Sequence, residues 1–202
     1  MKIKSLVLFS FALVLFSCKK ESSLPADTTI RDVDGHVYET VKIGTQTWTC
    51  ENLRTAHYND GSPIPTGLSD SAWAADTIGA YAVYNNNAVN DTIYGKLYNW
   101  YAVHTGKLAP AGWHVPTDAE LIALRNYLGG PYVAGGVLKA TTLWNSPNAG
   151  AKDSLGFSAL PAGFRDYDGS YVKLGDYCYI WSSDQAHTGY ARYFALFYNI
   201  PG

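Results

Sequence analysis

The chain of 202 residues carries 15 lysines and arginines against 17 aspartates and glutamates, and 14% of its residues are aromatic. Its formal net charge of −2 at pH 7 excludes a broadly basic surface, and therefore the electrostatic attraction to phosphate groups on which nucleic-acid binding depends. The length is sufficient for one domain with a hydrophobic core of its own.

The N-terminal segment predicts export and lipidation. Two lysines precede an apolar run over residues 6–16, which is too short to span a bilayer and has the proportions of a signal peptide. The "LFSC" that follows ends at Cys18 and resembles the lipobox of bacterial lipoproteins, whose thiol receives the lipid. We therefore expect residues 1–17 to be a signal peptide and residues 18–27 a polar tether. The alternative is an ordinary secretory signal in which Cys18 is incidental.

Cys18 would then attach the protein to the membrane. The charged residues directly after it resemble the surface-export signals of Bacteroidetes lipoproteins. We expect an outer-membrane lipoprotein whose domain lies in the periplasm or on the cell surface.

Turn and strand signals dominate the first half of the chain. Residues 28–43 predict a hairpin around Asp32–Gly35, and a second turn at Gly44 leads into "QTWTCENL". Residues 54–94 show no strong periodicity and are rich in Pro, Gly and Asn, which predicts a long loop of the kind that often carries function. The segment "YGKLYNWYAVH", residues 94–104, predicts a short helix.

The stretch "LAPAGWHVPTDAEL", residues 108–121, contains the densest local signals. The residue before Pro116 is held extended, and Thr117 with Glu120 forms a capping box that starts a helix. Leucines at helical spacing follow, and Gly129 ends the helix. These signals indicate a folding role for five residues: Trp113, His114, Pro116, Thr117 and Glu120.

The remaining segments predict a loop and four strands. Residues 134–144 are expected to form a glycine-punctuated loop. Residues 156–172 predict two strands joined by a turn at Asp166–Gly169, and residues 177–184 and 190–198 predict two closing strands.

Six motifs together resemble a known family. They are "DVDGHVYETVKIGTQTWTCENLR", "YNDGSPIP", "YGKLYNWYAV", "LAPAGWHVPTDAEL", "GFSALPAGFRDYDGSY" and "IWSSD", in that order. In this combination they resemble the Fibrobacter succinogenes major paralogous domain family of secreted and lipid-anchored bacterial domains. That family is in turn similar to the C-type lectin-like fold and to the formylglycine-generating sulfatase modifiers.

The resemblance implies an α+β fold over residues 28–202, with two short helices against loop-rich antiparallel sheets. Members often carry a cysteine where Ala109 stands, and a final strand beyond the point at which this chain ends at Gly202. The resemblance therefore implies a domain without its last strand, whose neighbouring strand has an open edge.

The residues that could support catalysis lack the partners that the chemistry requires. Formylglycine formation needs a cysteine pair, yet Cys178 has no second cysteine near it, and "GFSAL" around Ser158 lacks the second glycine of a nucleophile elbow. The five histidines show no metal-ligand spacing, and the turns at Asp32–Gly35 and Asp166–Gly169 supply only half of a calcium loop. We expect no enzyme activity, no cofactor and no metal. Whether Cys50 and Cys178 pair in a disulfide is left open.

Composition favours a binding domain. Amides pair with sugar hydroxyls, and exposed aromatic rings stack on the apolar faces of sugars. The predicted ligand-binding surface lies in the long loop and comprises Trp73, Tyr84, Asn85, Asn86, Asn87, Asn90 and Asp91. We expect a carbohydrate ligand. The alternatives are a structural or adhesive surface protein that contacts another protein, and, less favoured, an enzyme related to the formylglycine-generating proteins.

Overall fold

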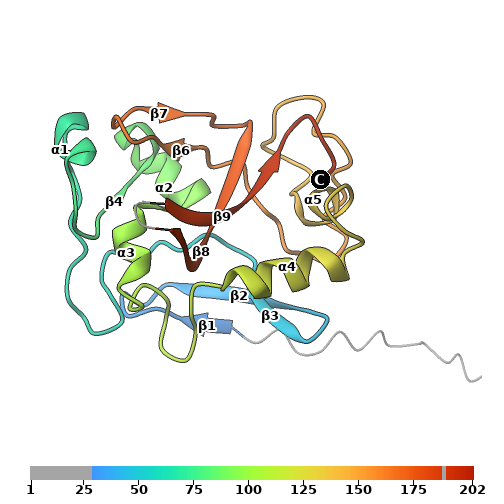
Figure 1. Cartoon of the computed structure of the whole chain (residues 1–202), viewed down its shortest axis with the longest axis horizontal. Helices are drawn as coiled ribbons and strands as arrows, with labels where there is room; N and C mark the ends of the chain where they lie inside the picture. The colour runs from blue at the N-terminus through green and yellow to red at the C-terminus, as the bar shows by residue number, and fades with distance from the viewer. Residues whose placement is uncertain (1–28, 188–189) are drawn as a thin grey trace, which may run out of the picture.

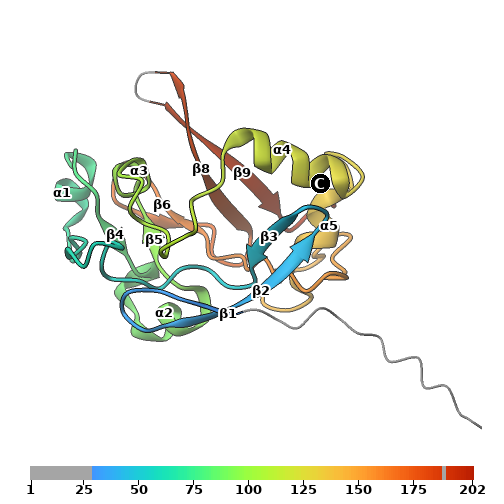
Figure 2. The ribbon, with the colours of Figure 1, turned by 90° about the horizontal axis from the view of Figure 1, so that it is seen from below.

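The computed structural model describes residues 29–187 and 190–202 and shows an α+β fold of short helices and small antiparallel sheets (Figure 1). The predicted signal peptide and tether, and with them Cys18, lie outside the described residues. Helix α1 (Asp70–Ala74) and the C-terminus lie at opposite ends of the molecule in both views (Figures 1 and 2). No helix within the described ranges is long and apolar enough to cross a bilayer.

A three-stranded antiparallel sheet forms the N-terminal part of the fold. Its strands, in spatial order, are β1 (Thr29–Arg31), β2 (Val37–Ile43) and β3 (Gln46–Thr49). Both predicted turns are confirmed, one between β1 and β2 and one between β2 and β3. Tyr38 of β2 is fully buried, and its hydroxyl is satisfied there because it donates to the Asp32 carboxylate at 2.6 Å and accepts from the Arg54 N–H at 2.9 Å.

Residues 54–94 are less irregular than predicted. Besides α1 they contain β4 (Tyr81–Ala82), the 3-10 helix η1 (Tyr84–Asn86) and α2 (Ala88–Tyr94). The prediction of a continuous loop is wrong for α2, which has clear end signals: the Asn87 side chain accepts from the Val89 N–H, and Gly95 ends the helix at a φ of 72°.

The helix predicted over residues 94–104 is only half right. Leu97 and Tyr98 form β5 (Leu97–Tyr98), which pairs with β4, and α3 (Trp100–His104) begins only after them. The boundary falls at Asn99 because its side chain accepts the Ala102 N–H at 2.9 Å and so caps α3.

Helix α4 (Asp118–Tyr127) confirms the strongest local prediction. Thr117 is its N-cap, and both halves of the capping box with Glu120 are present. Leu121 and Leu124 are buried, which places the helical repeat against the core.

The loop predicted over residues 134–144 contains a fifth α-helix, α5 (Ala134–Leu138), so the expected number of two helices is too low. Its glycines serve close packing. The Gly136 N–H donates to the Pro201 carbonyl at 2.6 Å, and a Cβ at Gly136 would lie only 2.4 Å from the Gly150 oxygen. The sequence does not predict α5 because its glycines have a low helix propensity. The helix is stabilised instead by its contacts with the neighbouring chain.

The C-terminal part consists of two hairpins, as predicted. Their strands are β6 (Phe164–Arg165), β7 (Tyr171–Val172), β8 (Tyr177–His187) and β9 (Tyr190–Phe197). The β8–β9 hairpin is the longest element and projects beyond the body of the domain beside α4 (Figure 2). Side chains at alternate positions of a strand share one face, so Tyr177, Tyr179 and Trp181 lie on the same face of β8.

Two hydrophobic clusters form the core. The larger combines residues of β2, α4, α5, β8 and β9, including Ile43, Leu124 and Leu196. The smaller is built on α3 and the chain around it, with Val103 and Leu108 among its members.

A buried ammonium group joins the C-terminal segments. Lys139 is fully buried, and its Nζ donates at 2.8 Å to each of three carbonyls, those of Ala149, Phe197 and Ile200. Nζ also lies 5.4 Å from the centre of the Trp144 ring. Burial lowers the pKa of Lys139 to about 8, so the side chain is still protonated at neutral pH.

Candidate functional site

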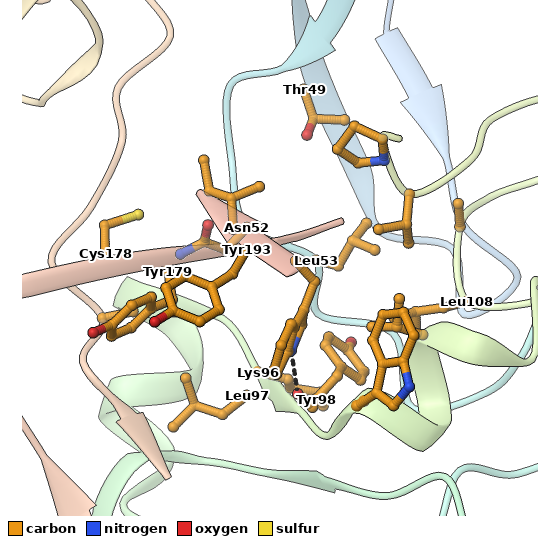
Figure 3. A pocket seen from close by; sticks show the side chains of 18 of the residues that line it. Thr49, Asn52, Leu53, Lys96, Leu97, Tyr98, Leu108, Cys178, Tyr179 and Tyr193 are labelled. Carbon is orange, nitrogen blue, oxygen red and sulfur yellow. Dashed lines mark hydrogen bonds between the residues drawn. The ribbon is translucent and has the colours of Figure 1, made fainter. Parts of the chain in front are cut away.

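A cleft of about 1040 Å³ opens between the two hydrophobic clusters (Figure 3). Segments far apart in the sequence line it: β3 and the chain after it, the end of α1, β5 with α3, residues 108–116, the β6 turn and the β8–β9 hairpin. Ligand sites of roughly 300–1,000 Å³ enclose drug-sized molecules, so this cleft is large for the size of the domain.

Aromatic rings dominate the lining. Five of the six tryptophans contribute to it, namely Trp48, Trp73, Trp100, Trp113 and Trp181. Three tyrosines of the lining are well exposed: Tyr101 on α3 at 43%, Tyr167 in the β6–β7 turn at 83% and Tyr193 on β9 at 55%. Exposed rings on three separate elements leave apolar faces free for a ligand.

The rings on the β8–β9 side are fixed by contacts with one another. Trp181 donates its indole N–H to the Tyr98 carbonyl at 2.8 Å, and its ring centre lies 6.0 Å from that of Trp100. The Tyr193 ring packs edge-on against both Trp181, at 6.3 Å, and Tyr179, at 4.9 Å. Tyr98, Tyr179 and Tyr193 are seen together in Figure 3. This part of the cleft is therefore pre-formed.

Arg165 stabilises the wall of the cleft that is formed by α1 and the β6–β7 turn. Its side chain is only 2% exposed and donates to the Gly169 carbonyl at 2.8 Å and to the Asp70 carboxylate at 2.9 Å. The guanidinium lies 4.6 Å from the Trp73 ring centre and 5.0 Å from that of Tyr171. Arg165 thus fastens α1 to the β6–β7 turn and positions Trp73 in the wall.

The 108–121 segment has a second role that its sequence did not reveal. The capping box confirms the folding role of Thr117 and Glu120, while Trp113, His114, Pro116 and Glu120 also line the cleft. His114 Nε2 lies 2.9 Å from both Glu120 carboxylate oxygens. Burial alone would raise the pKa of Glu120, but hydrogen bonds from the Thr117 N–H, the His114 ring and the Thr117 hydroxyl outweigh it and hold that pKa below its ordinary value.

Of the seven residues predicted to bind a ligand, only Trp73 lines the cleft. Tyr84 is buried, and its carbonyl accepts from the Asn90 side chain at 3.0 Å. Both carboxylate oxygens of Asp91 accept from Lys96 Nζ at 2.8 Å. These polar groups stabilise the loop itself.

The three consecutive asparagines also have local roles. Asn87 caps α2, and the Asn86 side chain accepts from the Tyr171 hydroxyl at 3.0 Å. Asn85 and Asn86 adopt positive φ values of 54° and 52°, a backbone region that asparagine tolerates better than most residues. The ligand role of the loop therefore stays a prediction, while the cleft gathers a different set of rings. The alternation of aromatic residues over 177–181 was the sequence signal that could have found part of that set, because it places Tyr179 and Trp181, which line the cleft, on one face of β8.

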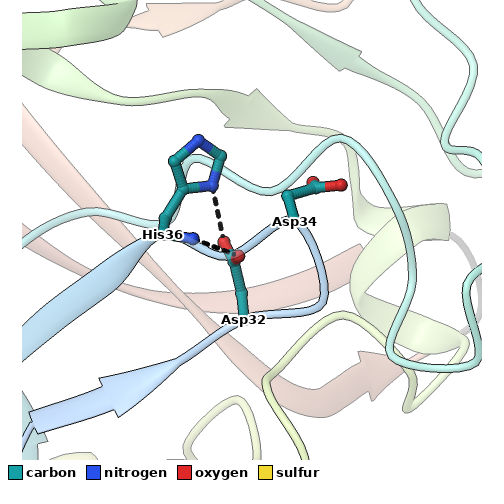
Figure 4. Close-up of side chains that lie close together, drawn as sticks. All are labelled: Asp32, Asp34 and His36. Atoms are coloured by element: carbon teal, nitrogen blue, oxygen red, sulfur yellow. Dashed lines mark hydrogen bonds and ion pairs between the residues drawn. The ribbon is translucent and has the colours of Figure 1, made fainter.

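One group of side chains outside the cleft is close enough to share a metal ion. Ligand atoms of Asp32, Asp34 and His36 lie within 4.8 Å of one another in the β1–β2 turn (Figure 4). Protein donors already occupy the Asp32 carboxylate, since it accepts from the His36 N–H and ring Nδ1, both at 2.9 Å, and from the Tyr38 hydroxyl.

The Asp34 carboxylate likewise accepts hydrogen bonds from protein groups, here from the chain after β3. It accepts from the Thr55 hydroxyl at 2.9 Å, from the Ala56 N–H and from the His57 ring. Burial opposes ionisation of Asp34, but these hydrogen bonds outweigh it and lower its pKa to about 2. The arrangement fastens the β1–β2 turn to residues 55–57, in agreement with the predicted turn role.

Cys50 and Cys178 do not form a disulfide with each other, so the alternative in which they pair is not realised. Cys178 is buried at the base of the cleft, and burial raises the pKa of its thiol to about 12. A thiol that stays protonated at neutral pH is a poor nucleophile.

Fold and cleft together define an α+β domain with a large cleft lined by aromatic rings. The model of the Fibrobacter succinogenes major domain matches residues 41–199, and the chain belongs to this family. Neither the curated proteins nor the solved structures contain a match to this chain.

Proposed function

We propose that the protein is a lipid-anchored protein of the cell envelope that binds carbohydrate, without catalysis, in the aromatic cleft of a C-type lectin-like domain. The observation that carries the proposal is the convergence of five tryptophans and three exposed tyrosines on one cleft. Aromatic rings of this kind stack on the apolar faces of sugars, while polar uncharged side chains such as Thr49 and Asn52 offer hydrogen bonds to hydroxyls.

The size of the cleft favours a chain of several sugars. A single monosaccharide would fill only part of about 1040 Å³. Tyr101, Tyr167 and Tyr193 stand on three different elements, so a ligand that touches all of them must extend along the cleft.

The state of Glu120, one of three carboxylates in the cleft lining, supports binding in preference to catalysis. A glycosidase needs one carboxyl that stays protonated and can donate a proton. Glu120 does not meet this requirement, because its pKa is lowered and its oxygens accept hydrogen bonds in the capping box and from His114.

Two matched tyrosine variants test the proposal. Tyr167 and Tyr132 are each 83% exposed, but only Tyr167 lines the cleft. We expect Tyr167→Ala to weaken binding to a polysaccharide in affinity electrophoresis about fivefold, which corresponds to a stacking contribution of about 1 kcal/mol. Tyr132→Ala is expected to bind like the parent protein. Equal binding by both variants would refute a role for the cleft rings.

The open edge of β9 favours a second candidate function, contact with another protein. Within the described residues, the backbone of 190–196 makes no backbone-to-backbone hydrogen bond outside its pairing with β8. An exposed edge of this kind accepts an added strand. Strand addition would slow hydrogen exchange of the β9 amides in the presence of an envelope fraction, whereas sugar binding would instead protect the cleft.

The anchoring part of the proposal depends on Cys18. We expect labelled palmitate to be incorporated into the full chain, and Cys18→Ser to lose both the label and the sedimentation with membranes. A labelled Cys18→Ser protein would contradict it.

A further inference from the structure

We infer that the cleft selects uncharged polysaccharides and rejects acidic ones such as those built from uronic acids. This inference rests on the proposed carbohydrate function and adds the chemical class of the ligand. It rests on the ion pairs and hydrogen bonds that each charged side chain of the cleft lining makes.

The two cations of the cleft are already neutralised by the protein. Lys96 is 7% exposed and bonds both oxygens of Asp91 at 2.8 Å. Arg165 is bound to Asp70, and rings cover it at 4.6 and 5.0 Å. A buried cation that is already in an ion pair binds a ligand carboxylate only weakly, because breaking the existing pair would leave a buried charge uncompensated.

His114 adds no free positive charge. Its Nε2 faces both oxygens of Glu120 at 2.9 Å, so a protonated ring would be neutralised by that carboxylate. Recognition of an acidic sugar typically uses an unpaired arginine or lysine, and the described lining has none.

The remaining charges of the lining are negative. Asp76 accepts from the Ile78 N–H at 3.0 Å and from the Asn99 amide at 3.0 Å, and Asp166 accepts from the Tyr167 N–H at 2.8 Å. Neither carboxylate has a cationic partner within salt-bridge distance in the part of the chain that the structure describes. No protein cation therefore offsets either carboxylate, and both oppose the approach of an anionic ligand, most strongly where water is excluded.

The test uses the full chain in non-ionic detergent micelles. Its migration is measured in native gels that contain a neutral polymer (glucomannan, xylan or hydroxyethyl cellulose) or an acidic one (polygalacturonate or alginate). We expect retardation by at least one neutral polymer and by neither acidic polymer. Retardation by an acidic polymer at least as strong as by the neutral ones would overturn the inference and leave the carbohydrate function standing. Absence of retardation by all five would overturn the carbohydrate function, and the inference with it.

A charge-reversal pair separates the cleft from the general surface. Asp166 lines the cleft, whereas Asp168 lies exposed on the same turn outside it. We expect Asp166→Lys to be retarded by polygalacturonate, which leaves the parent protein unretarded, and Asp168→Lys to remain unretarded; an unretarded Asp166→Lys would also overturn the inference. Equal gains by both variants would show that charge acts through the surface as a whole and would overturn the inference.

Discussion

Replacing Lys139 by methionine tests how the C-terminal segments are held to the domain. Methionine keeps most of the apolar stem but removes the ammonium group, so the carbonyls of Ala149, Phe197 and Ile200 lose their common donor. The variant therefore tests the three hydrogen bonds of the ammonium group alone, because the aliphatic packing is largely retained.

The expected loss of stability combines two opposing contributions. A buried carbonyl left without a partner costs about 1–3 kcal/mol, so three of them cost roughly 3–9 kcal/mol. Removal of a buried charge gives back about 3 kcal/mol, as judged from a pKa lowered from 10.5 to about 8. The difference between the two contributions is roughly 0–6 kcal/mol. We expect the free energy of unfolding to fall by about 3 kcal/mol, the middle of this range, because a value near zero requires that the carbonyls find other partners.

Urea unfolding at pH 7, followed by circular dichroism, measures this change. Lys152→Met is the matched control, because Lys152 is exposed and its replacement is expected to change the stability by less than about 0.5 kcal/mol. A loss below about 1 kcal/mol for Lys139→Met would refute the reasoning, since water or a shifted backbone would then satisfy the carbonyls equally well.

Three further variants test other contacts. Asp34→Asn should cost about 1–2 kcal/mol at pH 7; because the folded pKa of Asp34 is lowered to about 2, the cost is full above pH 4 and disappears as the pH falls through 2. Thr117→Ala removes the N-cap of α4 and should cost about 1 kcal/mol in urea unfolding. Gly136→Ala would normally favour a helix, but its Cβ would lie 2.4 Å from the Gly150 oxygen, so we expect a loss of more than about 2 kcal/mol in thermal unfolding.

Each of these variants has an outcome that contradicts its explanation. A cost for Asp34→Asn that stays constant down to pH 2 would show that the hydrogen bonds, and not the charge, stabilise the turn. Thr142→Ala, at an exposed threonine, is the control for the cap, and an equal effect of the two threonine variants would exclude a capping role. A stabilised Gly136→Ala protein would show that the chain around Gly150 can move away from α5.

The parts of the fold that could be predicted are those whose signals lie within a few residues. The capping box of α4, the turns of the first sheet and the β6–β7 turn each depend on neighbours in the sequence, and all are confirmed. Helix α5 was missed because two glycines lower its propensity, and what makes a helix suitable there is the close approach of Pro201 and Gly150.

The candidate site was harder to predict for the same physical reason. The asparagines of residues 84–91 predict a ligand-binding surface, yet their amides cap a helix and bond backbone groups locally. The cleft instead assembles rings that are more than a hundred residues apart in the sequence, such as Trp73 and Trp181, and only tertiary packing brings these together.

The distribution of the indole rings makes the domain its own optical probe. Five of the six tryptophans surround the cleft, whereas Trp144 packs in the core beside Lys139. Occupation of the cleft would displace water from several fluorophores at once, so emission from the unmodified protein should change with ligand concentration. Affinities could then be titrated without labelling either component.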